Sequence, residues 1–276
     1  MGATASSGTT HAEGDRPAVR LEVDATTRVG SIVLDRPPLN ALDLSVWEEL
    51  AHVVADVGAR DDVRAILVRG DHRAFAVGVD VAEARSWDPQ TAFAASGRMQ
   101  DVTTALAELP QVSIAVVSGY VLGGGCGIAL ACDFRFAADN AKIGLPEVLY
   151  GAMPGAGETQ RLARLIGVGR AKELLFTGRM VDMVEAPTIG LVDHVLPADD
   201  VVAAATAAAE GFAAGPASLA LIKRAIDEGS SLSLHDGLLL ERRLLAEAFA
   251  TGDFAAGSAA FLSDGPGAAR FDGRHR

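Results

Sequence analysis

One stretch of the chain, residues 112–132, constrains the fold more than any other because it contains no charged residue. A run of this length could cross a lipid bilayer. Its first part, VSIAVV, is typical of a buried strand, however, and Gly119, Gly123, Gly124, Gly125 and Gly127 crowd its middle. We therefore predict a buried strand, a glycine turn and a buried helix rather than a membrane span.

Strand and helix patterns alternate along the rest of the chain. Strands are predicted at 19–23, 29–34, 63–68, 112–117 and 134–137, helices at about 45–57 and 124–131, and a helical region after residue 80 that ends at about 108. The first helix is expected to begin with Ser45 as N-cap and Glu48 as its capping-box partner. After about residue 195 only helices are predicted, at 201–214, 218–228 and 232–250. The chain is thus an α/β core followed by a helical region.

The formal net charge of −12 argues against nucleic-acid binding and against attachment to an anionic membrane surface. Hydrophobic residues make up 49% of the chain, which is enough apolar surface for a packed core. Two cysteines, Cys126 and Cys132, are too few for a disulfide framework or a zinc site and indicate buried free thiols in a reducing, cytoplasmic compartment. Residues 1–17 carry no apolar segment and are predicted to be a disordered tail rather than a signal peptide.

The remaining clues to function lie in glycine-rich loops that match none of the common catalytic or binding motifs. The chain has no phosphate-binding loop, no dinucleotide fingerprint, no serine-hydrolase elbow and no spacing typical of metal ligands. What remains is a strand, a glycine loop and a helix, twice, around residues 74–80 and 123–125. Two such turns facing one carbonyl oxygen would form an oxyanion hole, since glycine lets backbone N–H groups approach a ligand closely. Tight packing of two turns would explain the same glycines.

Six spaced segments carry a resemblance to a known family. They cover 36–42, 74–80, 118–127, 145–151, 153–161 and 176–179, and read RPPLNAL, AFAVGVD, SGYVLGGGCG, LPEVLYG, MPGAGETQR and FTGR. In this order they resemble the crotonase superfamily, the enoyl-CoA hydratases and isomerases, over about residues 18–262. The resemblance implies a spiral core of repeated ββα units at 18–197 and a C-terminal helical trimerisation region at 198–276. It also implies a homotrimer or a dimer of trimers.

The resemblance implies an acyl-CoA thioester as substrate, with no resident cofactor or metal. In the family two backbone N–H groups polarise the thioester carbonyl, and these correspond here to Val79 and Gly124. Further positions are implied to contact the substrate or its CoA part: Leu39, Ala41, Ala76, Asp80, Val81, Tyr120, Leu122, Gly127 and Pro146. Trp87 and Met153 are additional candidates for the acyl pocket, and Arg36 and Arg270 are candidate cations for the CoA phosphates.

The expected proton chemistry departs from the family pattern at one position. Hydratases of this family use two glutamates, and this chain keeps the second as Glu147 but has Gly127 in place of the first. Adding water needs one group to deprotonate the water and another to deliver a proton. Moving a double bond needs a single shuttling base. The chemistry therefore favours isomerisation over efficient hydration.

A second departure leaves alternatives open. Glu158 stands where hydratases usually have a glycine, either as a carboxylate favoured by the helix dipole or as a relocated second acid. The leading hypothesis is an acyl-CoA enzyme that stabilises a thioester enolate, with Glu147 as acid/base, in fatty-acid metabolism. The alternatives are a non-catalytic or regulatory acyl-CoA-binding protein, or a thioester hydrolase or decarboxylase of the same fold.

Overall fold

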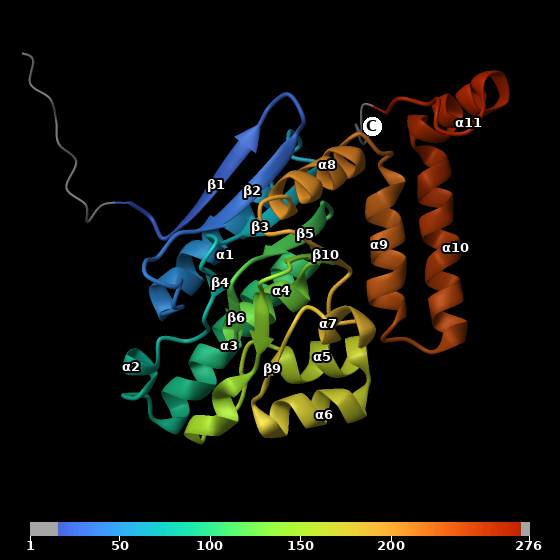
Figure 1. Ribbon diagram of the computed structural model, residues 1–276. Coiled ribbons are helices and arrows are strands. Elements are labelled where there is room, and N and C mark those ends of the chain that lie inside the picture. The colour runs from blue at the N-terminus through green and yellow to red at the C-terminus, as the bar shows by residue number, and fades with distance from the viewer. Residues whose placement is uncertain (1–15, 272–276) are drawn as a thin grey trace, which may run out of the picture.

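The computed structural model describes residues 16–271 and contains two β-sheets wrapped by helices (Figure 1). The larger sheet has the order β1-β2-β3-β5-β7-β10 and the smaller one β4-β6-β8-β9. The predicted tail, residues 1–17, lies almost entirely outside the described residues. The strands are β1 Val19–Asp24, β2 Val29–Leu34, β3 Ala65–Arg69, β4 Ala74–Ala76, β5 Val112–Val117, β6 Tyr120–Leu122, β7 Phe134–Ala138, β8 Lys142–Gly144, β9 Met180–Val181 and β10 His194–Leu196.

Eleven α-helices and one 3-10 helix complete the described part of the chain. They are α1 Leu44–Gly58, α2 Val81–Ala84, α3 Pro89–Ala107, α4 Gly124–Ala131, η1 Pro146–Tyr150, α5 Glu158–Ile166, α6 Val168–Thr177, α7 Glu185–Thr188, α8 Val201–Ala213, α9 Ser218–Gly229, α10 Leu234–Ala250 and α11 Gly252–Asp264. The alternation of strands and helices confirms the predicted α/β class.

Both faces of the larger sheet are covered, which explains its uninterrupted apolar strands. β1 and β2, at the positions of the first two predicted strands, form an antiparallel hairpin, and the strands that follow β2 in the sheet are parallel to one another. Along β3 and β5, alternate side chains such as Leu67 and Ile114 pack against α8, while Ile66 and Ala115 join the cluster that contains α1, α3 and α4. The helix α8 thus belongs to the packing of the sheet, and the predicted boundary at residue 198 stays a prediction.

The charge-free run folds as predicted, into β5, β6 and α4, and α4 is buried throughout. Cys126 and Cys132 are free and buried, and burial raises the pKa of the Cys132 thiol to about 12. Within residues 16–271 no single helix is long and apolar enough to cross a membrane. The helices α8 and α9 reach the required length and apolar content only when taken together, and the chain bends by 104° between them. The reducing compartment inferred from the cysteines stays a prediction.

Some predicted boundaries were wrong because capping residues were misassigned. The first helix begins at Leu44, and Asp43 is its N-cap, accepting a hydrogen bond from the Val46 N–H; Ser45 instead donates to Asp43. The helical region expected up to about residue 108 is confirmed and consists of two helices, because Asp80 and Asp88 each cap a separate start. The helix α11 was missed, since its small, glycine-containing sequence has a weak apolar period.

A buried ion pair attaches the C-terminal helices to the core. The Lys223 ammonium on α9 lies 2.9 Å from the Asp133 carboxylate and also donates to the Gln111 carbonyl. The same carboxylate accepts hydrogen bonds from the N–H and hydroxyl of Ser113 on β5. The helices α9 and α10 then run side by side along the edge of the core (Figure 1).

Removing this attachment has a measurable cost. The Lys223 side chain is only 8% exposed, so Lys223→Ala leaves the Asp133 charge partly buried without its cation. We expect Lys223→Ala to lower the free energy of unfolding by about 2 kcal/mol. The neighbouring Arg224→Ala, which breaks only exposed ion pairs, should cost less than about 0.5 kcal/mol. Urea denaturation of the two variants tests this, and equal midpoints would contradict it.

Candidate active site

Three loops meet at one edge of the smaller sheet. The strands β4, β6 and β8 are parallel neighbours, so their carboxyl ends point the same way. Residues 77–79 follow β4, Gly123 and Gly124 follow β6, and residues 145–147 follow β8. Loops beyond the carboxyl ends of parallel strands are the usual place for a ligand site in such sheets.

The first two loops touch through glycine backbones. A side chain at Gly78 would lie 2.9 Å from the Leu122 carbonyl oxygen and 3.2 Å from the Gly124 nitrogen. Gly78 and Gly123 also have φ values of 85° and 49°, which glycine adopts more easily than other residues. The close approach of these loops therefore requires glycine at both positions.

Each of the two touching loops carries an N–H group that has no acceptor among the described residues. Leu42 donates to the Gly78 carbonyl, and Asp80 donates to the Leu42 carbonyl, so Val79, between them, directs its own N–H away from Leu42. Gly124 is the first residue of α4, where a helix has no acceptor for the N–H. Neither N–H donates a hydrogen bond to any other described residue. The two donors predicted from the sequence are thus in adjacent loops and unpaired.

Asn40 holds the first loop and was not singled out from the sequence. Its buried side-chain amide donates to the carbonyl oxygens of Ala74 and Phe75 on β4, and its side-chain oxygen accepts from the Arg36 N–H. Asn40 has a φ of 56°, a conformation that asparagine tolerates better than most residues. The sequence signal that could have identified Asn40 is an asparagine in a turn that follows Pro37 and Pro38.

Glu147 lies in the third loop, in the first turn of η1. Its side chain is buried, with 5% exposure, and one carboxylate oxygen, Oε2, has no hydrogen-bond partner among the described residues. The other, Oε1, contacts the Cα side of Gly123, where any β-carbon would collide with it. Burial raises the pKa of the Glu147 carboxyl above its ordinary value. Glu147 is therefore a buried carboxylate in contact with Gly123, the residue that precedes the Gly124 donor.

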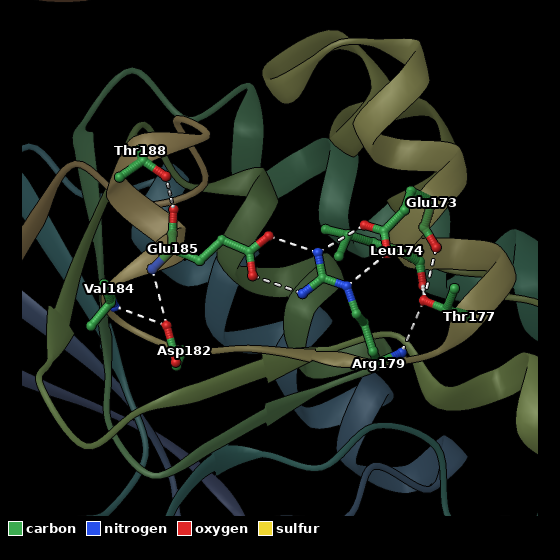
Figure 2. A network of polar contacts seen from close by, with 8 residues as sticks. All are labelled: Glu173, Leu174, Thr177, Arg179, Asp182, Val184, Glu185 and Thr188. Carbon is green, nitrogen blue, oxygen red and sulfur yellow. Dashed lines mark hydrogen bonds and ion pairs between the residues drawn. The ribbon is translucent and has the colours of Figure 1, made fainter.

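An ion-pair network fixes the turn behind Glu147. Arg179 bonds Glu173 on α6 and Glu185 on α7, each through two hydrogen bonds of 2.6 to 2.8 Å (Figure 2). The preceding Gly178, with a φ of 62°, packs on Val148 and Leu149 of η1. Arg179 thus holds the α6–β9 turn against the short helix that carries Glu147.

Glu158, the first residue of α5, is more deeply buried than Glu147, with 1% exposure. Its Oε2 accepts a 2.8 Å hydrogen bond from the Ala156 N–H, and its Oε1 has no partner among the described residues. Burial, together with the nearby Glu147 charge, raises the pKa of the Glu158 carboxyl to about 7. Two buried carboxylates with raised pKa values therefore lie near each other.

The other residues predicted to contact the substrate differ in how far they are buried. Leu39, Ala41, Leu122 and Pro146 are half-buried, whereas Val81 and Tyr120 are exposed. Ala76 is fully buried against Gly125, so its side chain faces the core. Asp80 caps α2 and pairs with Arg36, whose guanidinium also binds Asp43.

The Arg36 cation is therefore already engaged by two carboxylates. Arg270 donates only to the carbonyls of Gly267 and Ala269 in its own loop, within the described part of the chain. Between residues 16 and 271 no group of three or more His, Cys, Asp or Glu side chains is arranged to hold a metal ion. A cavity of about 580 Å³ lies elsewhere, beyond the amino ends of β3 and β5, and contains none of the predicted site residues.

Comparisons with known proteins agree with this geometry. The family model for enoyl-CoA hydratase/isomerase matches residues 24–268. A probable enoyl-CoA hydratase (echA8) of Mycobacterium bovis is 42% identical over 247 residues, covering 87% of this chain and 93% of that protein. Another probable enoyl-CoA hydratase (EchA17), of Mycobacterium tuberculosis, is 39% identical, covering 80% of this chain and 85% of its own length.

Solved structures show the same fold. A crystal structure of enoyl-CoA hydratase from Bacillus anthracis has a TM-score of 0.87 and 35% identity, covering 93% of this chain and all of that one. A crystal structure of the enoyl-CoA hydratase from Geobacillus kaustophilus has a TM-score of 0.90 and 32% identity, covering 94% of this chain and 98% of that one. The predicted crotonase-like fold, with its C-terminal helices, is thereby confirmed. The chain belongs to the enoyl-CoA hydratase/isomerase family.

Proposed function

We propose that this protein is an acyl-CoA enzyme that stabilises a thioester enolate and uses Glu147 to move a proton, in the isomerisation or hydration of an enoyl-CoA. The observation that carries the proposal is the meeting of two unpaired N–H groups and a buried carboxylate where three parallel strands end. The proposal needs no resident cofactor, because the chain's own groups supply each role.

The N–H groups of Val79 and Gly124 would both donate to the thioester oxygen. That oxygen gains negative charge as the enolate forms, so donors fixed in advance stabilise the transition state more than the substrate. The position of Gly124 at the N-terminus of α4 adds the favourable helix dipole. Each such donor is typically worth about 3 kcal/mol of barrier.

Glu147 would then transfer the proton beside the carbonyl. In double-bond isomerisation its carboxylate removes a proton from C2 of a 3-enoyl thioester and returns it to C4 of the dienolate. Burial makes the carboxylate a stronger base than an exposed glutamate, since it raises the carboxyl pKa. The CoA part would lie along Leu39, Ala41, Asp80 and Val81, with Tyr120, Leu122, Gly127 and Pro146 near the acyl part, whereas the burial of Ala76 in the core does not support a contact there.

Enoyl absorbance of two substrates tests the proposal. With crotonyl-CoA, loss of the conjugated band reports hydration; with a 3-enoyl-CoA, gain of the band reports isomerisation. We expect turnover of at least one substrate by the wild type and a loss of about 1000-fold in kcat in Glu147→Gln. Glu210→Gln, an exposed change on α8, is the control. Tight binding of both CoA esters without turnover would instead identify a binding protein.

The raised pKa of Glu158 predicts how stability depends on pH. The carboxyl has an ordinary pKa of 4.5 and titrates near 7 in the folded protein, so the folded state holds this proton more tightly. Its contribution to stability is fully present below about pH 4.5 and is lost as the pH rises through 7. Relative to wild type, Glu158→Gln should gain about 3 kcal/mol in unfolding free energy between pH 4.5 and pH 8.

Urea denaturation at several pH values measures this difference. Asp199→Asn, at an exposed position, serves as the control and should run parallel to the wild type. A Glu158→Gln curve parallel to the wild type would contradict the raised pKa.

We also propose that the C-terminal helices form a homotrimer or a dimer of trimers. Large apolar side chains are exposed along them: Ile222, Ile226, Leu232, Leu234, Leu238, Leu239, Leu245, Phe249, Phe254, Phe261 and Leu262. Exposed apolar surface of this extent is typical of a contact with another chain. Sedimentation equilibrium should give three or six times 28.4 kDa.

Phe249→Glu on α10 should lower the measured mass, because it places a charge in the buried contact. Val202→Glu, on the exposed side of α8, should leave the mass unchanged. A monomeric wild type would contradict the proposed assembly.

A further inference from the structure

We propose that Glu158 is a second catalytic carboxylate that works opposite Glu147 in the hydration of an enoyl thioester, and that residue 127 is glycine because the Glu158 carboxylate fills the space of its side chain. This inference rests on the function proposed above. It deepens that function by selecting hydration, which needs two proton-transferring groups, over isomerisation, which needs one.

The carboxylate of Glu158 lies where a side chain on residue 127 would begin. A β-carbon built on Gly127 would stand 2.9 Å from Glu158 Oε1 and 3.1 Å from its carboxyl carbon. The first distance is shorter than a real β-carbon contact, and the second is tighter than most, so a side chain at residue 127 would require the Glu158 carboxylate to shift. A carboxylate attached to α5 thus occupies the position that a longer residue at 127 would occupy from α4.

The two carboxylates lie along the same turn of the chain. Glu147 Oε1 contacts Gly123, and Glu158 Oε1 contacts Gly127. The Gly127 N–H donates to the Gly123 carbonyl at 3.0 Å, so the two glycines are one helical turn apart, about 5 Å. The nearby Cys126 and Tyr150 both feel the charges of Glu147 and Glu158, which places the two carboxylates in one region.

The burial of Glu158 is not explained by helix stability alone. A carboxylate in the first turn of α5 would gain from the helix dipole equally well at the surface. Glu158 is instead 1% exposed with Oε1 unpartnered, as Glu147 is 5% exposed with Oε2 unpartnered. Buried carboxylate oxygens without partners are costly, and two of them in one region are typical of sites that transfer protons.

The pair can add water with balanced proton transfer. The Glu147 carboxylate takes a proton from water as the water oxygen bonds to C3 of the enoyl thioester. The C2–C3 π electrons move to the thioester oxygen, held by the Val79 and Gly124 N–H groups, and the enolate then takes a proton on C2 from the Glu158 carboxyl. One proton passing from Glu147 to Glu158 restores the starting state. An acid with a pKa near 7 suits the second step at neutral pH.

Reciprocal exchange of the two residues tests the inference. Glu158→Gln and Glu158→Gly should each lower kcat for hydration of crotonyl-CoA by 100-fold or more, and isomerisation of a 3-enoyl-CoA by less than about tenfold. Gly127→Glu alone should have a lower kcat for hydration, because the new side chain would collide with the Glu158 carboxylate. The double variant Gly127→Glu/Glu158→Gly moves the carboxylate from α5 to α4 and should recover hydration to within about tenfold of wild type.

The pH dependence of kcat distinguishes a catalytic role of Glu158 from a purely structural one, because a structural residue would not set an apparent pKa of the reaction. The wild-type kcat for hydration should fall as the pH rises through an apparent pKa near 7, and this limb should disappear in Glu158→Gln. Wild-type kcat for hydration retained in Glu158→Gln, while Glu147→Gln is inactive, would overturn the inference. So would a wild type that isomerises but does not hydrate, which leaves the proposed function standing. A wild type with neither activity overturns both.

Discussion

The contact between Gly78 and the Gly123–Gly124 backbone is the constraint on which the rest of the site depends. Any β-carbon at Gly78 would enter the space of the next loop, and any at Gly123 would displace Glu147. Glycine at these positions lets two strand ends close on each other, which leaves their N–H groups unpaired and adjacent. The cost is chain entropy and two unsatisfied donors, which a bound carbonyl oxygen would satisfy.

The surrounding structure holds this partly unpaired centre in place. Asn40 satisfies two carbonyls at the end of β4, and Arg179 joins α6 to α7 behind η1. Neither side chain reaches the unpaired N–H groups. Their hydrogen bonds fix the loops that carry Val79 and Glu147, so the donors and the base keep their positions without a ligand. Rigid placement of this kind is what catalysis by fixed dipoles requires.

The interpretation of Gly127 and Glu158 depends on their surroundings in the folded chain. In the sequence, Gly127 is a missing acid and Glu158 an extra one, thirty-one positions along the chain. In the structure, α4 and α5 pack together, and the Glu158 carboxylate stands beside Gly127. The two departures from the family pattern are thus one feature, because a side chain from either helix can fill the same space.

The sequence by itself determined the α/β class, the buried glycine-rich run, the loops with candidate donors and the position of the candidate base Glu147. These follow from local patterns, since periodicity, glycine and charge act over a few neighbouring residues. The N-cap of the first helix was assigned to Ser45 instead of Asp43, because several polar residues compete to cap a helix. Only the tertiary structure decided that Glu158 meets Gly127 and that its carboxyl is buried. Distance between residues far apart in sequence depends on how helices pack, and burial alone converts an ordinary glutamate into one that holds its proton near neutral pH.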